Sequence, residues 1–97
     1  MATIPELNDI VLEIPELPGV EVRCKSVSLG RAQQLDGLEF DKSNRTFVEE
    51  VIQSWNVTDA NGDPVPVTMD AVLAMPAWVL PALRGAWNRG LLTPPKA

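Results

Sequence analysis

The polar stretch NVTDANGDPVPV contains the side chains best suited to metal chemistry in this sequence. Asp59, Asn61 and Asp63 present oxygens at alternate positions, as the first half of a calcium-binding loop does. An EF-hand loop also requires Gly at position 6 and Glu at position 12. Counting from Asp59 places Gly62 at position 4 and Asp70 at position 12. The spacing therefore does not fit a calcium loop.

The same stretch is better explained as a turn between two strands. Asn61-Gly62 is a strong hairpin signal, because both residues adopt positive φ at low cost. Apolar residues alternate with polar ones before the turn, at Trp55 and Val57, and with prolines after it, from Val65 onward. Those prolines cannot donate to a ladder, which restricts the second strand to a sheet edge. We therefore expect a β-hairpin here.

The residue types elsewhere argue against catalysis. The chain has no His, no Tyr and a single Cys, which excludes Ser–His and Cys–His pairs and His-based metal sites. Its glycines form no phosphate-binding motif. Carboxylates are plentiful, and residue type alone leaves a two-carboxylate hydrolase open, but we do not expect so small a fold to form the necessary cleft. We predict a non-enzyme with no catalytic residue, no cofactor and no metal.

Composition indicates one small globular domain. The 97 residues are 45% hydrophobic and 22% charged, with no apolar run of membrane-spanning length. The first residues do not resemble a secretory signal, which favours the cytoplasm. We expect a single domain over 1–97, with 1–9 as a flexible arm and 93–97 as a flexible tail. Cys24, between charged neighbours on a predicted strand, is expected to be a buried small hydrophobe.

Charge is unevenly distributed along the chain. Residues 1–63 hold twelve acids and five bases, a net of −7, whereas residues 64–97 hold one acid and three bases, a net of +2; together they give −5. An acidic body argues against nucleic-acid binding, which needs a basic surface. The asymmetry hints that the C-terminal part meets a different environment, such as an acidic partner.

Apolar alternation predicts an N-terminal β-hairpin, with strands at 10–14 and 20–25 joined by a turn at 15–19. Ser28 is placed to cap a short helix through LGRAQQLDGL, and the segment DGLEFDKSN is expected to be a polar connector.

The clearest helical pattern begins after Ser43 or Asn44, either of which is a suitable N-cap. Its apolar residues follow the spacing of a buried stripe: Phe47, Val48, Val51, Ile52 and Trp55. The intervening Glu49, Glu50 and Gln53 are expected to face solvent.

Two helices are predicted after the Asn-Gly hairpin. Thr68 caps one that stops at Pro76, and the last runs from about Ala77 to Asn88. Pro81 then lies in the first turn, and Gly90 is a suitable C′ residue. The expected fold is a small α+β domain in which an N-terminal β-hairpin and the Asn-Gly hairpin pack with three to four short helices.

The last predicted helix also offers a candidate binding surface. Trp78 lies half a turn away from Trp87, so the two indoles cannot easily share one face. Trp78 either tucks back onto the preceding helix as part of the core, or anchors an exposed strip with two small residues and a cation. The candidate partner-binding residues are Trp78, Ala82, Arg89, Leu91 and Leu92.

The order of segments resembles the tail assembly chaperones of long-tailed bacteriophages. The resemblance covers about residues 10–90 and rests on LPGVEVRCKSVSLG and on VEEVIQSWNVTDANGDPVPVT, followed by a small helical end. Pro76, just before the last helix, and Pro81, in its first turn, depart from the family pattern. No binding residue is carried over, because the matching motif is the hairpin.

The resemblance implies a protein of the infected bacterial cytoplasm that binds the long helical tape measure protein until tail tube subunits polymerise around it. The tail tube protein and a second copy of the chain are further partners to consider, and many such proteins also have a longer, frameshifted form. Two alternatives remain: a structural virion protein, such as a head–tail connector or capsid-associated subunit, and an unrelated adaptor.

Overall fold

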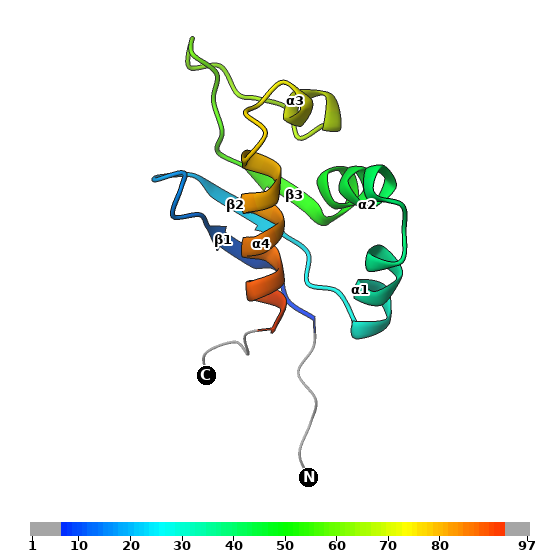
Figure 1. Cartoon of the computed structure of the whole chain (residues 1–97). Helices are drawn as coiled ribbons and strands as arrows, with labels where there is room; N and C mark the ends of the chain where they lie inside the picture. The colour runs from blue at the N-terminus through cyan, green and yellow to red at the C-terminus, as the bar shows by residue number, and fades with distance from the viewer. Residues whose placement is uncertain (1–6, 93–97) are drawn as a thin grey trace.

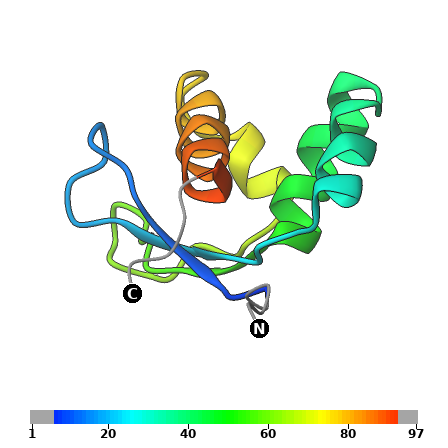
Figure 2. The same ribbon diagram turned by 90° about the horizontal axis from the view of Figure 1, so that it is seen from below.

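The computed structural model describes residues 7–92, which form a three-stranded antiparallel sheet with all helices on one side (Figures 1 and 2). The predicted α+β class is confirmed. The strands, in spatial order, are β1 (Ile10–Glu13), β2 (Glu21–Cys24) and β3 (Ile52–Trp55). The α-helices are α1 (Leu29–Asp36), α2 (Phe40–Thr46), α3 (Met69–Leu73) and α4 (Val79–Leu92). The segments predicted as flexible, 1–9 and 93–97, lie outside the described residues except for 7–9.

The N-terminal hairpin forms as predicted. Leu12 pairs with Val22, and both side chains are buried, whereas Glu13 on β1 and its partner Glu21 on β2 are exposed. Alternation over β1 and β2 therefore gives one face to the core and one to solvent. Gly19 closes the turn with φ of 82°, a conformation that glycine adopts without a Cβ penalty.

Two helix starts predicted from capping residues are confirmed. The Ser28 hydroxyl accepts a hydrogen bond from the Arg31 backbone N–H at 3.2 Å, at the start of α1. The Thr68 hydroxyl accepts from the Ala71 N–H at the same distance, at the start of α3. Each cap satisfies one of the backbone donors that a helix N-terminus leaves unpaired.

The predicted helix start at Ser43 or Asn44 is wrong. Helix α2 begins at Phe40, so part of the expected polar connector is helical, and both capping candidates lie buried inside the helix. Their side chains instead accept hydrogen bonds from Arg84 of α4, at 3.1 and 3.2 Å. A long-range partner thus replaces the local capping role that these residue types favour.

The predicted continuation of this helix to Trp55 is also wrong. After α2 the chain makes one π-helical turn at Phe47–Val51 and then extends as β3. Ile52 pairs with Cys24 and Trp55 with Val22, with a register shift between Arg23 and Cys24. Ile52 and Trp55 are three residues apart, which fits a helix better than a regular strand, but the register shift lets both pack on the core opposite Cys24 and Val22. Pairing with the open edge of β2 therefore outweighs the helical pattern.

The Asn-Gly hairpin, residues 57–66, forms with a three-residue loop. The Val65 N–H donates to the Val57 carbonyl, and the Asp59 N–H donates to the Asp63 carbonyl at 2.9 Å. Gly62 has φ of 85°, but no non-glycine residue in 7–92 has positive φ. The expectation that Asn61 would share the left-handed conformation is therefore wrong, because this loop is a type I turn followed by a left-handed glycine.

Helix α4 is longer than predicted and lies across the sheet (Figure 1). Gly90 is inside the helix rather than at its C′ position. A Cβ at Gly90 would lie 2.9 Å from the Ile10 side chain, so the glycine permits close packing of α4 on β1. Trp87 and Leu83 face the core, and the Trp87 indole N–H donates to the Lys25 carbonyl at 3.2 Å.

Candidate functional site

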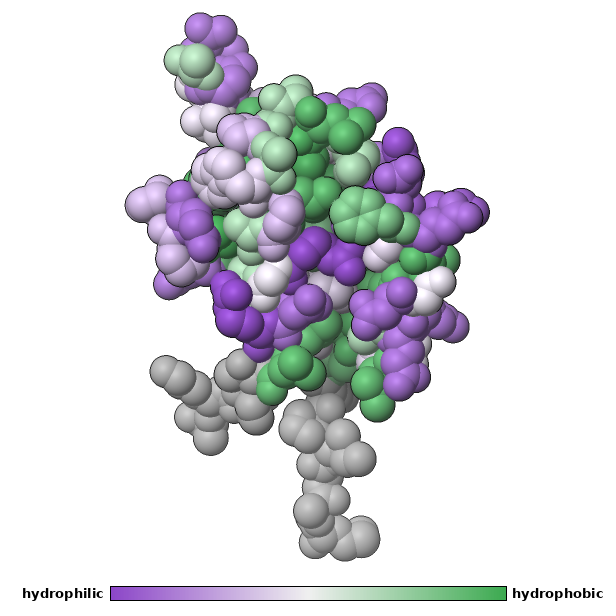
Figure 3. Space-filling model, viewed as in Figure 1, coloured by the Kyte–Doolittle hydropathy of each residue, from purple (hydrophilic) through white to green (hydrophobic). Residues whose placement is uncertain are grey.

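An apolar groove of about 600 Å³ lies between the 57–66 hairpin, α3 and the start of α4. In Figure 3, apolar surface gathers over α3 and beside the start of α4, below the projecting hairpin. Of the sixteen lining residues, Thr58 and Asp59 alone are polar. The lining consists of Leu17, Val20, Trp55, Val57, Thr58, Asp59, Pro64, Val65, Pro66, Ala71, Ala74, Met75, Pro76, Trp78, Val79 and Leu83. We call this feature the apolar groove.

One wall of the apolar groove is fixed to the sheet by two side chains. The Trp55 indole N–H donates to the Val65 carbonyl at 2.7 Å, which ties the 57–66 hairpin to the end of β3. Asn56 accepts from the Glu21 N–H at 2.8 Å and donates to the Gly19 carbonyl at 3.0 Å. These contacts join the two hairpins and fix this wall of the groove to the sheet.

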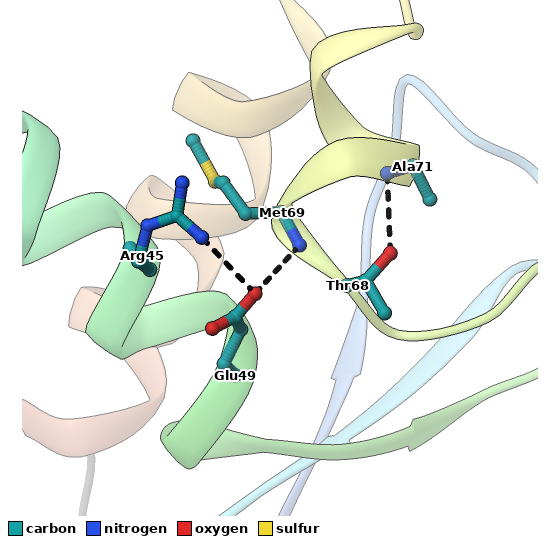
Figure 4. A network of polar contacts seen from close by, with 5 residues as sticks. All are labelled: Arg45, Glu49, Thr68, Met69 and Ala71. Atoms are coloured by element: carbon teal, nitrogen blue, oxygen red, sulfur yellow. Dashed lines mark hydrogen bonds and ion pairs between the residues drawn. The ribbon is translucent and has the colours of Figure 1, made fainter.

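The opposite wall, α3, is held by a side chain that the sequence pattern assigned to solvent. One Glu49 oxygen accepts from the Met69 backbone N–H at 3.2 Å and pairs with Arg45 at 3.5 Å (Figure 4). Together with the Thr68 cap, Glu49 satisfies a second donor at the α3 N-terminus and anchors this five-residue helix to the π-helical turn. The spacing of apolar residues around Glu49 cannot reveal this role, because the role depends on where a helix twenty residues further along the chain lies.

Trp78 is the candidate residue that lines the groove directly. Its side chain is 48% exposed, whereas Trp87 is 2% exposed. The two indoles therefore lie in different environments, as their half-turn separation indicates. Trp78 lines the groove together with Ala71 and Ala74 of the α3 segment, and it is not part of the core cluster.

The other candidate residues lie away from Trp78 along α4. Ala82 and Leu91 are half-buried against the core, and Leu92 is 84% exposed in the last turn. Arg89 is exposed in that last turn as well. Trp78 and Leu92 are fourteen positions apart, about 21 Å at the usual helical rise, so the structure does not gather the five residues into one patch. The sequence also does not reveal that the 57–66 hairpin forms a wall of the groove, because its pattern predicts only a turn between two strands.

The electrostatic surroundings of the apolar groove are acidic. Asp59 lies in one wall, and Asp70 lies one turn before Ala74 on the other. A neighbouring hollow, which shares Leu17 and Val20 with the groove, contains Glu13 and Glu21. Neither lining includes a Lys or an Arg.

The single thiol is placed for packing and not for reaction. Cys24 is fully buried on β2, and burial raises the pKa of its thiol to about 12. The thiol is therefore protonated at neutral pH, which removes the nucleophilic form. The prediction that Cys24 is a buried small hydrophobe is confirmed.

Asp59, the first residue of the rejected calcium pattern, serves the turn. One of its carboxylate oxygens accepts from the Asn61 N–H at 2.8 Å and from the Asp63 N–H at 3.0 Å. Within residues 7–92, no three His, Cys, Asp or Glu side chains cluster as metal ligands would. In the same part of the chain, every helix is too short or too polar to cross a bilayer.

Comparisons of this chain with protein-family models, with curated protein sequences and with solved structures return no match.

Proposed function

We propose that this protein binds another polypeptide and acts as a tail assembly chaperone, holding the tape measure protein in the host bacterial cytoplasm during phage tail morphogenesis. The observation that supports a binding role is the apolar groove, in which fourteen of sixteen lining residues are apolar and Trp78 is half-exposed. A well-formed apolar pocket with a few polar groups at its edge is the usual place for another molecule to bind. The assignment to tail assembly rests on the resemblance of the segments around the two hairpins.

A shielding role also suits the residue types. A groove with one charged side chain provides no general acid–base pair, so its contribution to any process is the burial of apolar surface. A tape measure protein is long and helical, and its apolar faces are uncovered until the tail tube forms. A small acidic protein that covers those faces would keep them from associating with one another.

Co-expression tests the role directly. The chain is produced with the tape measure protein of the same phage, whose gene we expect just downstream, and the soluble fraction of the tape measure protein is measured. We expect the wild type to raise that fraction and Trp78→Ser to lose most of the effect, because the groove loses its largest exposed side chain. Leu29→Ser is the matched control, since Leu29 is exposed on α1 and does not line the groove.

Mass spectrometry of purified virions separates the proposal from its main rival. A chaperone is absent from mature particles, whereas a head–tail connector or capsid-associated subunit is present in many copies. Detection of this chain at stoichiometric levels in virions would replace the proposed function by a structural one.

A further inference from the structure

We infer that the apolar groove accepts a basic amphipathic α-helix of the partner, with Lys or Arg residues flanking its apolar face. This inference rests on the proposed polypeptide-binding role and names the segment of the partner that is bound. It follows from the hydrogen-bonding capacity of the groove and from the charges around it.

The groove offers little to a segment that needs backbone hydrogen bonds. Pro64, Pro66 and Pro76 line it and have no N–H to donate. On the 57–66 hairpin, the Val65 N–H is already bonded to Val57, and the Val65 carbonyl already accepts from Trp55. An extended peptide would therefore lose solvent partners for its backbone without gaining a ladder.

A helix avoids this cost, because its N–H and C=O groups bond within the segment. Its apolar residues, at spacings of three and four, form one stripe along the helix. This stripe can lie in the groove with Trp78 on one side and α3 on the other. The volume of about 600 Å³ is that of a site for several large side chains.

Charge selects among amphipathic helices. Asp59 lines the groove on the hairpin wall, Asp70 lies one turn before the lining residue Ala74, and Glu13 and Glu21 line the adjoining hollow. With no Lys or Arg in either lining, the rim attracts cations and repels acids. The acidic partner suggested by the net charge of residues 64–97 is therefore not the occupant that we expect in the groove. A second copy of this chain is disfavoured as the occupant, since it would bring a net charge of −5 to an acidic rim.

Three labelled synthetic peptides of about 18 residues, five helical turns, test the inference by fluorescence anisotropy. The first has Leu at the apolar positions of an amphipathic helix and Lys elsewhere. The second replaces every Lys by Glu, and the third is the Leu/Lys peptide with two central prolines. We expect the first to bind the full chain, more weakly at high salt, and the other two to bind at least about tenfold more weakly.

Two variants of α3 localise the binding. Ala74→Arg adds a cation inside the groove at an exposed position. We expect this variant to bind the Leu/Lys peptide with about tenfold lower affinity. Leu73→Arg adds the same charge at the adjacent residue, which is 67% exposed and lies outside the groove lining, and is expected to change affinity by less than about twofold. Circular dichroism and thermal unfolding confirm that both variants are folded.

The inference is overturned if the Leu/Glu or proline peptide binds as well as the Leu/Lys peptide, or if the two variants behave alike. Its failure differs from failure of the proposed function. If the tape measure protein is solubilised through Trp78 while no Leu/Lys peptide binds, the helix inference is wrong and the chaperone role stands. If the peptide binds as expected but the tape measure protein does not, the inference stands and the chaperone role is wrong.

Discussion

Arg84 joins parts of the chain that are forty residues apart. It donates to Ser43 and Asn44 of α2, and its guanidinium carbon lies 5.2 Å from the Phe47 ring centroid. Phe47 in turn contacts Trp87, with ring centroids 5.3 Å apart. Ser43 and Asn44 are buried, so they depend on Arg84 for hydrogen bonding that water would otherwise supply.

Replacing Arg84 should therefore be costly. We expect Arg84→Met to lower the free energy of unfolding by about 1–3 kcal/mol, because two buried acceptors lose a charged donor. Arg45→Met is the control, since its pair with Glu49 is exposed and worth less than about 1 kcal/mol. Urea unfolding of the two variants measures the difference, and equal losses would show that the buried contacts are not significant.

The Cys24 thiol predicts a loss of stability at alkaline pH. Its pKa is about 12 in the folded chain and about 8.5 when unfolded, so above pH 9 the unfolded state has released its proton and the folded state has not. The stabilisation is complete below the unfolded pKa and is lost as pH rises toward the folded one. We expect unfolding free energy to fall between about pH 9 and 11, by up to about 1.4 kcal/mol per unit.

The control for this pH dependence is Cys24→Ala, which is less stable at neutral pH but contains no titrating thiol. The chain has no Tyr and no His, so few other groups titrate near pH 9. Parallel curves of unfolding free energy against pH for the wild type and the variant would contradict the assignment.

Among the secondary-structure elements, the packing of α4 on β1 depends on a glycine. Gly90 faces Ile10 and Leu12, at 2.9 and 3.4 Å from where a Cβ would lie. We expect Gly90→Ala to destabilise the fold by about 1–2 kcal/mol, because overpacking outweighs the helix propensity that alanine adds.

Gly30→Ala in α1 is the matched control for that substitution. Its Cβ would have Ser28 Oγ as its nearest neighbour, at 4.0 Å, so we expect unchanged stability or a gain of up to about 1 kcal/mol. Thermal unfolding compares the two, and a stabilising Gly90→Ala would show that α4 can shift away from the sheet without loss.

Helix α3 forms a wall of the groove although it is short. Five residues do not make a stable helix in isolation, so α3 depends on the Thr68 cap, on the Glu49 contact and on the buried Met69 and Val72. The groove thus depends on a side chain, Glu49, that is not among its lining residues.

For the molecule as a whole, net charge and the apolar groove have opposite effects on association between copies of the chain. The charge of −5 makes copies of the chain repel one another at neutral pH, and the sequence pI is about 4.5. We expect reversible association near pH 4.5, where repulsion vanishes and the groove is free to contact another copy. Light scattering at pH 4.5 and 7 measures it, and Trp78→Ser should reduce the effect; identical scattering by that variant would place the contact elsewhere.

Local signals predicted much of this fold correctly. Alternation over 10–13 and 21–24 gave the first hairpin, Ser28 and Thr68 gave two helix starts, and Asn61-Gly62 gave the second hairpin. In each case the deciding interactions join residues close in the chain, or follow from a period that one buried face imposes.

Contacts between distant residues decided the remainder. Whether 52–55 continues a helix or forms a strand depends on the open edge of β2, and whether Ser43 caps a helix or lies inside one depends on Arg84. The candidate site divides in the same way. The half-turn separation of Trp78 from Trp87 predicted an exposed Trp78 as one alternative, but the groove exists only where the 57–66 hairpin, α3 and α4 meet. The physical reason is that the spacing of apolar residues predicts which side chains are buried, because burial from water is not directional, but does not predict which distant side chains they pack against.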